Sequence, residues 1–336
     1  MKKLLTLAAL SLAGAASVQA QTVLVASSWV PPTHTLSMAQ KEWCDLLAKN
    51  TSNRVRCNIL PRAVTPPAGT YDAVRNGQAD LSFGVHGYTP GRFTLTKMAE
   101  FPWLGDRAEP LSVAFARIAQ RHPKIIEEHP GVKLITVFTH GPGIVFNTKR
   151  PITKTDDLKG MKFRVGGGII NDIAPLLDMN ITLKPATDSF ELLSTGVMDG
   201  TLFPAESLDS FKIDKVVKHA TFFPGGLYNT SFFFVMNQAK YNSLSAQDKK
   251  AVDDISGEVA ARIFGKGWDV VDGKAIENMS KNGVVITKAN PSFVSDVTVR
   301  LNKLERDWAR DAGAKGLNNA SGVLAEFRAE IAKLQK

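Results

Sequence analysis

The sequence lacks the features that would place it within a membrane. After its first twenty residues, no segment approaches the ~20 consecutive apolar residues that a spanning helix needs. Those first residues have the pattern of an export signal, with Lys2 and Lys3, an apolar run, and small residues up to Ala20. No cysteine stands at the expected cleavage point, which argues against a lipid anchor. We expect a signal peptide over residues 1–20 and an exported, periplasmic protein that begins at Gln21.

Motifs of catalysis and cofactor binding are also missing. There is no His-Glu-x-x-His, no Cys-x-x-Cys, no Gly-x-Ser-x-Gly and no Walker-type phosphate loop. The six histidines are dispersed, so no metal site is predicted. Gly166–Gly168 lacks the Gly-x-Gly-x-x-Gly spacing, because Asn171 stands at the sixth position. We therefore expect no enzyme activity, no cofactor and no bound metal.

Positive charge is in excess, but it is not gathered into a patch. The formal net charge is +9, and +7 remains without Lys2 and Lys3. Nucleic-acid binding requires a clustered basic footprint, often with aromatic residues between the charges. Neither is present, so we expect no nucleic-acid partner. The charge is compatible with an exported protein that handles anions.

Only two cysteines occur, Cys44 and Cys57. An even number in an exported chain favours a disulfide. Cys44 lies in a helical pattern and Cys57 in a strand-like one, and a neighbouring helix and strand could bring them together. The alternative is two small buried apolar residues.

Short strands alternate with helical patterns from Val23 onward, which indicates an α/β fold with largely parallel sheets. About 316 residues after the signal suit two domains. A short pattern that occurs twice supports two similar lobes. A helix end is followed by Gly77, Asp80 and a strand, and a later helix end is followed by Gly196, Asp199 and a strand. Each glycine suits a left-handed helix C-cap.

An apolar helical face runs without proline from about residue 245 to 281. If unbroken, this helix is long enough to run along both lobes, although Gly265, Gly267 and Gly273 could break or kink it. Further amphipathic helices are expected over residues 292–311 and 320–336.

The stretch GMKFRVGGG places Arg164 in a short strand just before three glycines. Arg164 could be a solvated surface charge, a phosphate reader or the anchor for an organic acid. Because Gly166–Gly168 lacks the spacing of a cofactor loop, we do not expect Arg164 to bind a phosphate group. The glycines would let backbone approach a ligand or another strand closely.

Three segments resemble the solute-binding subunits of TRAP (tripartite ATP-independent periplasmic) transporters of the DctP family. They are PITKTDDLKGMKFRV (residues 151–165), TGVMDG (195–200), and FVMN with the following Leu-Ser (234–237 and 244–245). The similarity covers essentially the whole mature chain.

The resemblance implies a two-lobed receptor with a ligand cleft, a long bridging helix and a membrane permease as partner. It also implies that Arg164 anchors a carboxylate, for which a guanidinium offers a matching planar fork. We expect lobe I over residues 21–142 and 231–271, lobe II over 143–230 and 272–336, and a monomer.

Two departures from the family pattern bear on the ligand. Ile144 stands where many members carry a second basic residue, and Phe203 stands where many carry a polar one. A small residue, Ala186, replaces a frequent large aromatic and leaves room for a bulkier ligand. A dicarboxylate or a sialic-acid-like sugar would leave polar groups unpaired, at about 1–3 kcal/mol each. A monocarboxylate with an apolar or aromatic body fits better.

Further ligand contacts are expected at strand ends, where open α/β sheets bind ligands. They are Trp29, His86, Tyr88, Gly166, Phe203, Glu206 and Tyr228. The aromatic residues could instead pack in the core or rim, His86 could make a polar loop contact, and Glu206 could be a solvated carboxylate.

We expect a receptor for an aromatic or branched 2-oxo or 2-hydroxy acid. The alternatives are a receptor for a cyclic or aromatic amino-acid-like acid such as pyroglutamate, and an exported enzyme acting on a small acid.

Overall fold

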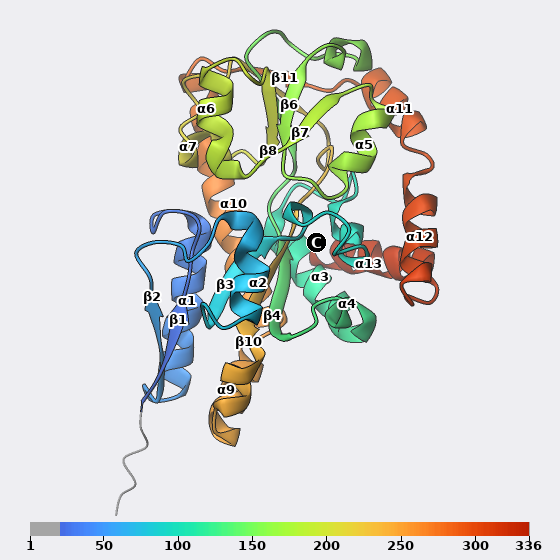
Figure 1. The fold of residues 1–336 in the computed structure, drawn as a ribbon. Helices are drawn as coiled ribbons and strands as arrows, with labels where there is room; N and C mark the ends of the chain where they lie inside the picture. The colour runs from blue at the N-terminus through green and yellow to red at the C-terminus, as the bar shows by residue number, and fades with distance from the viewer. Residues whose placement is uncertain (1–20, 336) are drawn as a thin grey trace, which may run out of the picture.

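The computed structural model describes residues 21–335 and consists of two lobes, each built around one sheet (Figure 1). The predicted signal peptide lies outside the described residues. Lobe I contains a five-stranded sheet and is the lower body in Figure 1, and lobe II contains a six-stranded sheet and is the upper one. The predicted two-lobed α/β fold is confirmed.

The lobe I sheet has the order β2-β1-β3-β10-β4, formed by β1 (Thr22–Ala26), β2 (Val55–Ile59), β3 (Leu81–Val85), β4 (Val132–Thr139) and β10 (Ser231–Asn237). The lobe II sheet has the order β11-β9-β5-β8-β6-β7, formed by β5 (Ile144–Asn147), β6 (Lys162–Val165), β7 (Asn180–Leu183), β8 (Gly200–Phe203), β9 (His219–Phe222) and β11 (Val285–Lys288). β10 and β5 run antiparallel to both of their neighbours, and the other pairs are parallel. The chain crosses between the lobes after β4, before β10 and again between β10 and β11.

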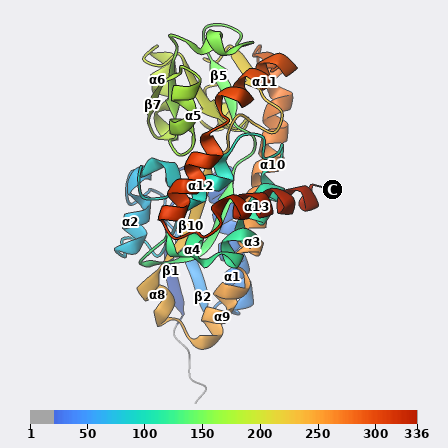
Figure 2. The same cartoon turned by 90° about the vertical axis from the view of Figure 1, so that its right-hand side faces the viewer.

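Helices cover the sheets (Figures 1 and 2). The α-helices are α1 (Thr35–Asn50), α2 (Thr70–Arg75), α3 (Ala108–Arg121), α4 (Pro123–Glu127), α5 (Ile170–Leu176), α6 (Ser189–Ser194), α7 (Ser207–Ser210), α8 (Gln238–Ser243), α9 (Ala246–Asp254), α10 (Glu258–Lys281), α11 (Pro291–Arg300), α12 (Leu304–Ala314) and α13 (Ala320–Leu334). Short 3₁₀ helices are η1 (Pro67–Gly69), η2 (His86–Tyr88), η3 (Leu95–Glu100), η4 (Thr155–Leu158) and η5 (Ala186–Asp188). Over residues 21–335, no helix combines the length and apolarity needed to cross a membrane.

The pattern of a helix end, a glycine, an aspartate and a strand that occurs twice in the sequence lies at equivalent places in the two lobes. Gly77 follows α2 with φ of +76°, and Gly196 follows α6 with φ of +74°. The carboxylate of Asp80 accepts the N–H of Val25 at 2.8 Å, and that of Asp199 accepts the N–H of Lys162 at 3.0 Å. In each lobe, the glycine ends the helix and the aspartate ties the following strand to its neighbour.

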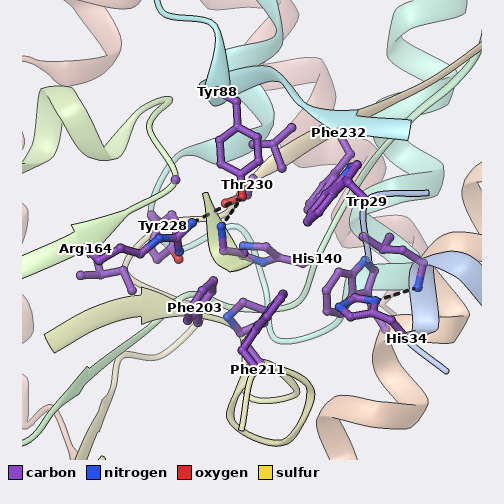
Figure 3. A pocket seen from close by; sticks show the side chains of 18 residues that line it. Trp29, His34, Tyr88, His140, Arg164, Phe203, Phe211, Tyr228, Thr230 and Phe232 are labelled. Carbon is purple, nitrogen blue, oxygen red and sulfur yellow. Dashed lines mark hydrogen bonds between the residues drawn. The ribbon is translucent and has the colours of Figure 1, made fainter. Parts of the chain in front are cut away.

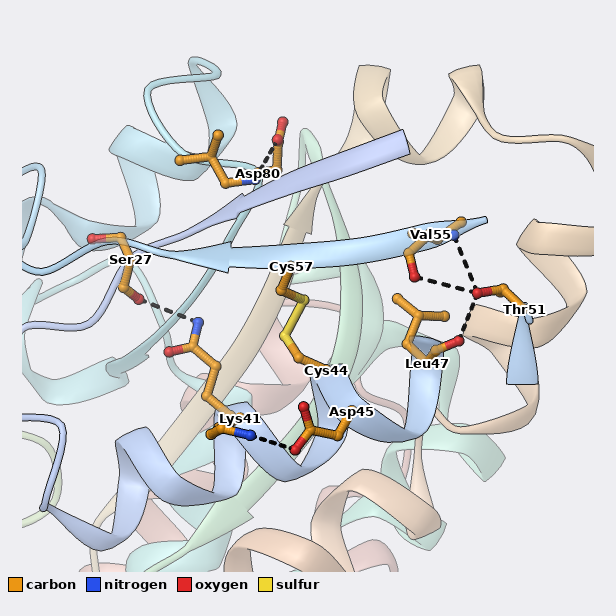
Figure 4. The surroundings of a disulfide bond; sticks show 11 residues. Ser27, Lys41, Cys44, Asp45, Leu47, Thr51, Val55, Cys57 and Asp80 are labelled. Atoms are coloured by element: carbon orange, nitrogen blue, oxygen red, sulfur yellow. Dashed lines mark hydrogen bonds and ion pairs between the residues drawn. A yellow bond between two sulfur atoms is a disulfide. The ribbon is translucent and has the colours of Figure 1, made fainter. Parts of the chain in front are cut away.

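Cys44 of α1 and Cys57 of β2 form a disulfide (Figure 4). The helix packs on one face of the sheet, so the two side chains meet across the layer. The bond closes a sequence separation of 13 residues. Loop closure of this size stabilises a fold by about 3 kcal/mol.

The predicted bridging helix over residues 245–281 is wrong in one respect, because it is interrupted between α9 and α10. Gly257 has φ of +60° and donates its N–H to the carbonyl of Ile135 at 2.7 Å. Its own carbonyl accepts the Thr136 hydroxyl at 2.8 Å. These bonds to β4 hold the backbone out of helical geometry. α10 then runs unbroken through Gly265, where a Cβ would lie 2.6 Å from the Cα of Glu109 in α3.

The C-terminal segment also differs from the expected division, which put all of residues 272–336 in lobe II. Strand β11 lies in the lobe II sheet, but α13 packs on α3 of lobe I. The rings of Phe115 and Phe327 lie 6.2 Å apart, and Arg117 pairs with Glu330 at 2.8 Å. The apolar face of α13 covers α3, which draws the chain end back to lobe I (Figure 2).

The two lobes touch backbone to backbone beside the three-glycine stretch. A Cβ on Gly87 of lobe I would lie 2.6 Å from both the carbonyl oxygen of Gly166 and the nitrogen of Gly168. A Cβ on Gly167 would lie 2.3 Å from the carbonyl oxygen of Gly87. At Gly87 and Gly167, only a hydrogen side chain fits this contact. We name the contact of Gly87 with Gly166–Gly168 the glycine seam. The Glu100 carboxylate of lobe I reinforces it by accepting the N–H of Ile169 at 2.7 Å.

Candidate functional site

A cavity lies between the lobes, at the carboxyl ends of several strands (Figure 3). The space between its lining atoms measures about 420 Å³, a figure that includes space open to solvent. Its lining is mostly aromatic and aliphatic, and it consists of Trp29, His34, Leu36, Val85, Tyr88, His140, Arg164, Gly166, Ala186, Leu202, Phe203, Pro204, Ser207, Phe211, Tyr228, Thr230, Phe232 and Trp268. The lining includes no carboxylate, and Arg164 is its one Lys or Arg side chain.

Arg164 projects from β6 into this cavity and is only 1% exposed. Its Nε donates to the carbonyl of Lys184 at 2.8 Å, which fixes the plane of the guanidinium. No Asp or Glu side chain within residues 21–335 forms an ion pair with it. Burial lowers the pKa of Arg164 from its usual value, although an arginine stays charged. The site therefore holds a buried cation that lacks an anion.

Tyr88 completes a polar corner beside Arg164. Its hydroxyl oxygen accepts the N–H of Ala186 at 2.9 Å and faces Nη2 of Arg164 at a longer 3.4 Å. With both lone pairs of that oxygen directed at donors, its proton is free to be donated. Guanidinium and hydroxyl together present the donors that a carboxylate accepts.

Aromatic rings form the walls around this corner. The Phe203 ring lies under the guanidinium of Arg164, 4.4 Å from its carbon, and stacks on Phe211. Ile144 pairs with Phe203 across β5 and β8 and is buried behind it. Trp29 packs edge-on against Tyr88 with ring centroids 6.0 Å apart. A flat apolar ligand body would thus find rings on several sides.

Two histidines line the cavity, and burial lowers the pKa of each to about 4. The Nδ1 atom of His34 accepts the N–H of Leu36 at 3.1 Å, so Nε2 carries the proton. That Nε2 lies 3.3 Å from a carboxyl oxygen of Glu206. Because both rings are neutral near pH 7, Arg164 is the only cationic group among residues 21–335 that borders the cavity.

The structure brings six of the predicted contacts together at the cavity: Trp29, Tyr88, Arg164, Gly166, Phe203 and Tyr228. His86 is not among them. Its side chain lies on the same face of the lobe I sheet as Phe233 and packs against that ring. Its Nε2 lies 2.8 Å from Nε2 of His129. His86 is thus part of a buried cluster on the other side of the sheet.

Glu206 also does not line the cavity. Its side chain turns behind the wall, where it bonds to Ser210 and reaches His34. It is buried, so the solvated-carboxylate alternative does not hold either.

Sequence reasoning missed several lining residues: His34, His140, Phe211, Thr230, Phe232 and Trp268. His140 directly follows β4, so the strand-end rule that identified Trp29 and Tyr88 would have identified it as well. Trp268 lies within α10, where nothing in the sequence separates a cavity face from a core face. Within the described chain, no group of three or more His, Cys, Asp or Glu side chains is placed to hold a metal ion.

Glu206 and Asp272 form a buried acidic pair next to the cavity wall. The backbone N–H of Glu206 donates to Asp272 at 2.8 Å, and both side chains are nearly inaccessible. Burial raises the pKa of Glu206 to about 8 and that of Asp272 to about 7. Both carboxyl groups are therefore protonated in the folded protein at mildly acidic pH.

We expect the contribution of Glu206 and Asp272 to the free energy of unfolding to fall as pH rises from about 4 to about 8, while the buried neutral histidines contribute in the opposite direction below about pH 6.5. Below pH ~4, both carboxyl groups are protonated in the folded and unfolded states. Above it, the unfolded chain releases these protons first, so rising pH favours unfolding until the folded pKa values are passed. Glu206→Gln should remove a loss of about 4 kcal/mol in unfolding free energy that Glu206 contributes between pH 5 and 8.5. Urea unfolding at several pH values measures this difference. The exposed Glu191→Gln is the control, and an unchanged pH profile in Glu206→Gln would contradict the assignment.

Comparisons with known proteins agree with this architecture. Residues 25–311 match the family model described as bacterial extracellular solute-binding protein, family 7 (DctP). The chain is 28% identical over 327 residues to the outer membrane transporter protein TsaT of Comamonas testosteroni, covering 97% of this chain and 96% of that one.

Two solved structures are similar over nearly the whole chain. A TRAP periplasmic solute-binding protein from Bordetella bronchiseptica, with bound (R)- and (S)-mandelate, is 41% identical with a TM-score of 0.91, covering 93% of this chain and 99% of that one. A marine metagenome TRAP solute-binding protein specific for aromatic acid ligands, with 3-hydroxybenzoate, is 29% identical with a TM-score of 0.87, covering 94% and 100%. This chain therefore belongs to the DctP family of bacterial extracellular solute-binding proteins and is a solute receptor of the TRAP type.

Proposed function

We propose that this receptor binds an aromatic monocarboxylate in the cavity between its lobes and delivers it to a TRAP permease in the membrane. The single observation that carries the proposal is Arg164, a buried cation without an anion inside an aromatic cavity. Burying a charge is costly unless it is paired. A ligand carboxylate supplies the missing partner, and its apolar body fills the space between the rings.

The composition of the lining supports one carboxylate rather than two. A dicarboxylate would bring a second anion to a cavity whose other ionisable rings, His34 and His140, are neutral. An amino acid would bring an ammonium group to a cavity whose lining has no carboxylate. The aromatic acids bound by the receptors from Bordetella bronchiseptica and the marine metagenome agree with this ligand class.

Arg164 and Tyr88 act together in this proposal. Arg164 donates to the carboxylate, Tyr88 donates its hydroxyl proton to the same group, and Phe203 supports the guanidinium from below. The ligand thereby contacts both lobes, because Tyr88 belongs to lobe I and Arg164 to lobe II. Binding a ligand that bridges the lobes stabilises the arrangement in which they touch.

The same proposal includes a monomeric, periplasmic protein that releases its ligand unchanged. The proposal is supported by the bonding of the lining hydroxyls, because neither Ser207 nor Thr230 forms a hydrogen bond to a histidine within residues 21–335, so no nucleophile–base pair is assembled there.

A competition experiment by native mass spectrometry tests the ligand class. The purified protein is incubated with equal amounts of mandelate, benzoate, succinate, N-acetylneuraminate and pyroglutamate. We expect a mass increment of one aromatic acid per chain. Dominant binding of succinate or the sugar acid would overturn the proposal, and binding of pyroglutamate would favour the alternative of a cyclic amino-acid-like ligand.

A further inference from the structure

His140 presents an unused hydrogen-bond acceptor at the cavity. The residue follows β4, is 3% exposed, and its Nδ1 lies 2.5 Å from the carbonyl oxygen of Gly141. A carbonyl oxygen only accepts, so Nδ1 must carry the proton. In a neutral imidazole the other nitrogen, Nε2, then has a free lone pair.

The surroundings keep the imidazole neutral. The ring is packed among three aromatic neighbours, with centroids 5.8 Å from Tyr228, 6.1 Å from Phe232 and 6.0 Å from Trp268. Burial among them lowers the pKa of His140 to about 4. A second proton on Nε2 is therefore disfavoured near neutral pH, and the lone pair stays available.

Among residues 21–335, the side chain of His140 forms its hydrogen bond through Nδ1, and none involves Nε2. The three rings meet the imidazole in tilted or edge-on arrangements rather than through a hydrogen bond. His140 lines the cavity and, in Figure 3, its ring lies between Tyr88 and Thr230 on one side and Phe203 and Phe211 on the other. A donor for Nε2 can therefore come from whatever occupies the cavity.

We infer that His140 is a specificity-determining residue that accepts a hydrogen bond from a hydroxyl group of the bound acid. The inference rests on the proposed function, because it assumes that a carboxylate occupies the corner formed by Arg164 and Tyr88. It predicts that the receptor binds hydroxy acids more tightly than unsubstituted acids and more tightly than 2-oxo acids.

The physical basis is the unequal cost of the three ligand types. A hydroxyl group donates to Nε2 and satisfies it. An unsubstituted acid displaces water from the cavity and leaves the buried acceptor unpaired. A 2-oxo group is worse, because its oxygen only accepts and places a second lone pair against that of Nε2. Sites built to bond a ligand hydroxyl reject the analogue that lacks it more strongly than apolar pockets reject a change in size.

Calorimetric titration with matched acids tests the inference. Mandelate, phenylacetate and phenylglyoxylate differ only at the carbon next to the carboxylate, which carries a hydroxyl, two hydrogens or an oxo group. 3-Hydroxybenzoate and benzoate form a second pair, with the hydroxyl on the ring. We expect at least one hydroxy acid to bind about tenfold more tightly than its partner without the hydroxyl. For mandelate, we expect an advantage over phenylglyoxylate as well.

Two variants tie the preference to Nε2. His140→Phe removes the acceptor, and we expect it to lose the hydroxyl preference, because unsubstituted acids no longer leave Nε2 unpaired and hydroxy acids no longer find an acceptor. His140→Gln offers an amide oxygen near the former Nε2 position and should restore part of that preference. Retained binding of the unsubstituted acids shows that the variant cavity is intact.

The outcomes separate the inference from the function on which it rests. Equal affinity for hydroxy and unsubstituted acids, or a preference that survives in His140→Phe, would overturn the inference and leave the aromatic-acid receptor standing. Absence of binding by all five acids would overturn the proposed function and the inference with it.

Discussion

Replacing Arg164 by methionine is expected to abolish ligand binding while the free protein remains at least as stable as the unmodified one. In the folded protein, Arg164 is a buried cation without a protein anion, so its removal relieves a desolvation cost. For the complex, the same change deletes the carboxylate's charged partner. Truncating a buried charge pair costs about 2–5 kcal/mol, so we expect the dissociation constant to rise about 30-fold or more. Thermal unfolding with and without an aromatic acid measures both effects together.

The matched control is Arg56→Met, which changes an exposed arginine that also lies on a strand. That variant should keep the full ligand-induced rise in melting temperature. Two results would contradict the role of Arg164. One is unchanged affinity in Arg164→Met, and the other is marked destabilisation of the free protein, which would indicate a structural ion pair instead of a ligand anchor.

Gly87→Ala is expected to weaken binding without weakening the fold. The φ of Gly87 is not in the positive region, so alanine strains nothing within lobe I. At the glycine seam, however, the new Cβ would lie 2.6 Å from backbone atoms of Gly166 and Gly168, which cannot rotate away. The lobes would have to separate slightly, and overpacking of this kind costs about 1–3 kcal/mol. We expect affinity to fall about tenfold or more.

Small-angle X-ray scattering would show the mechanism of that loss. The unmodified protein should become more compact when ligand is added, and Gly87→Ala should do so less. Gly313→Ala is the matched control, because a Cβ there meets nothing within 4 Å and its φ is not positive. If Gly87→Ala binds and compacts like the control, the glycine seam does not limit closure.

Local signals in the sequence were enough for much of the fold. Gly77 and Gly196 end helices through their own backbone preference, and Asp80 and Asp199 act within their own αβ units. The break at Gly257 could not be predicted in the same way. It depends on bonds to Ile135 and Thr136, which lie more than 120 residues earlier in the chain. The packing of α13 on α3 likewise depends on a tertiary contact that periodicity does not reveal.

In the candidate site, too, some residues could be predicted from their position in the sequence and others could not. Trp29, Tyr88 and Phe203 were identified because they stand at or just beyond strand ends, where the topology gathers side chains, and Arg164 was identified through the family resemblance. His86 stands in an equivalent position, but its side chain leaves β3 on the opposite face and packs against His129 and Phe93. The direction of a side chain at a strand end depends on the turn that follows, and sequence spacing alone does not settle it.

The most direct test of the central claim is a calorimetric titration of the unmodified protein with mandelate and, separately, with succinate. The account predicts one mandelate per chain, with a negative heat-capacity change as the aromatic ring is buried, and no measurable heat from succinate. Saturable one-to-one binding of succinate that exceeds the affinity for mandelate would contradict the claim that Arg164 meets a single carboxylate on an aromatic acid.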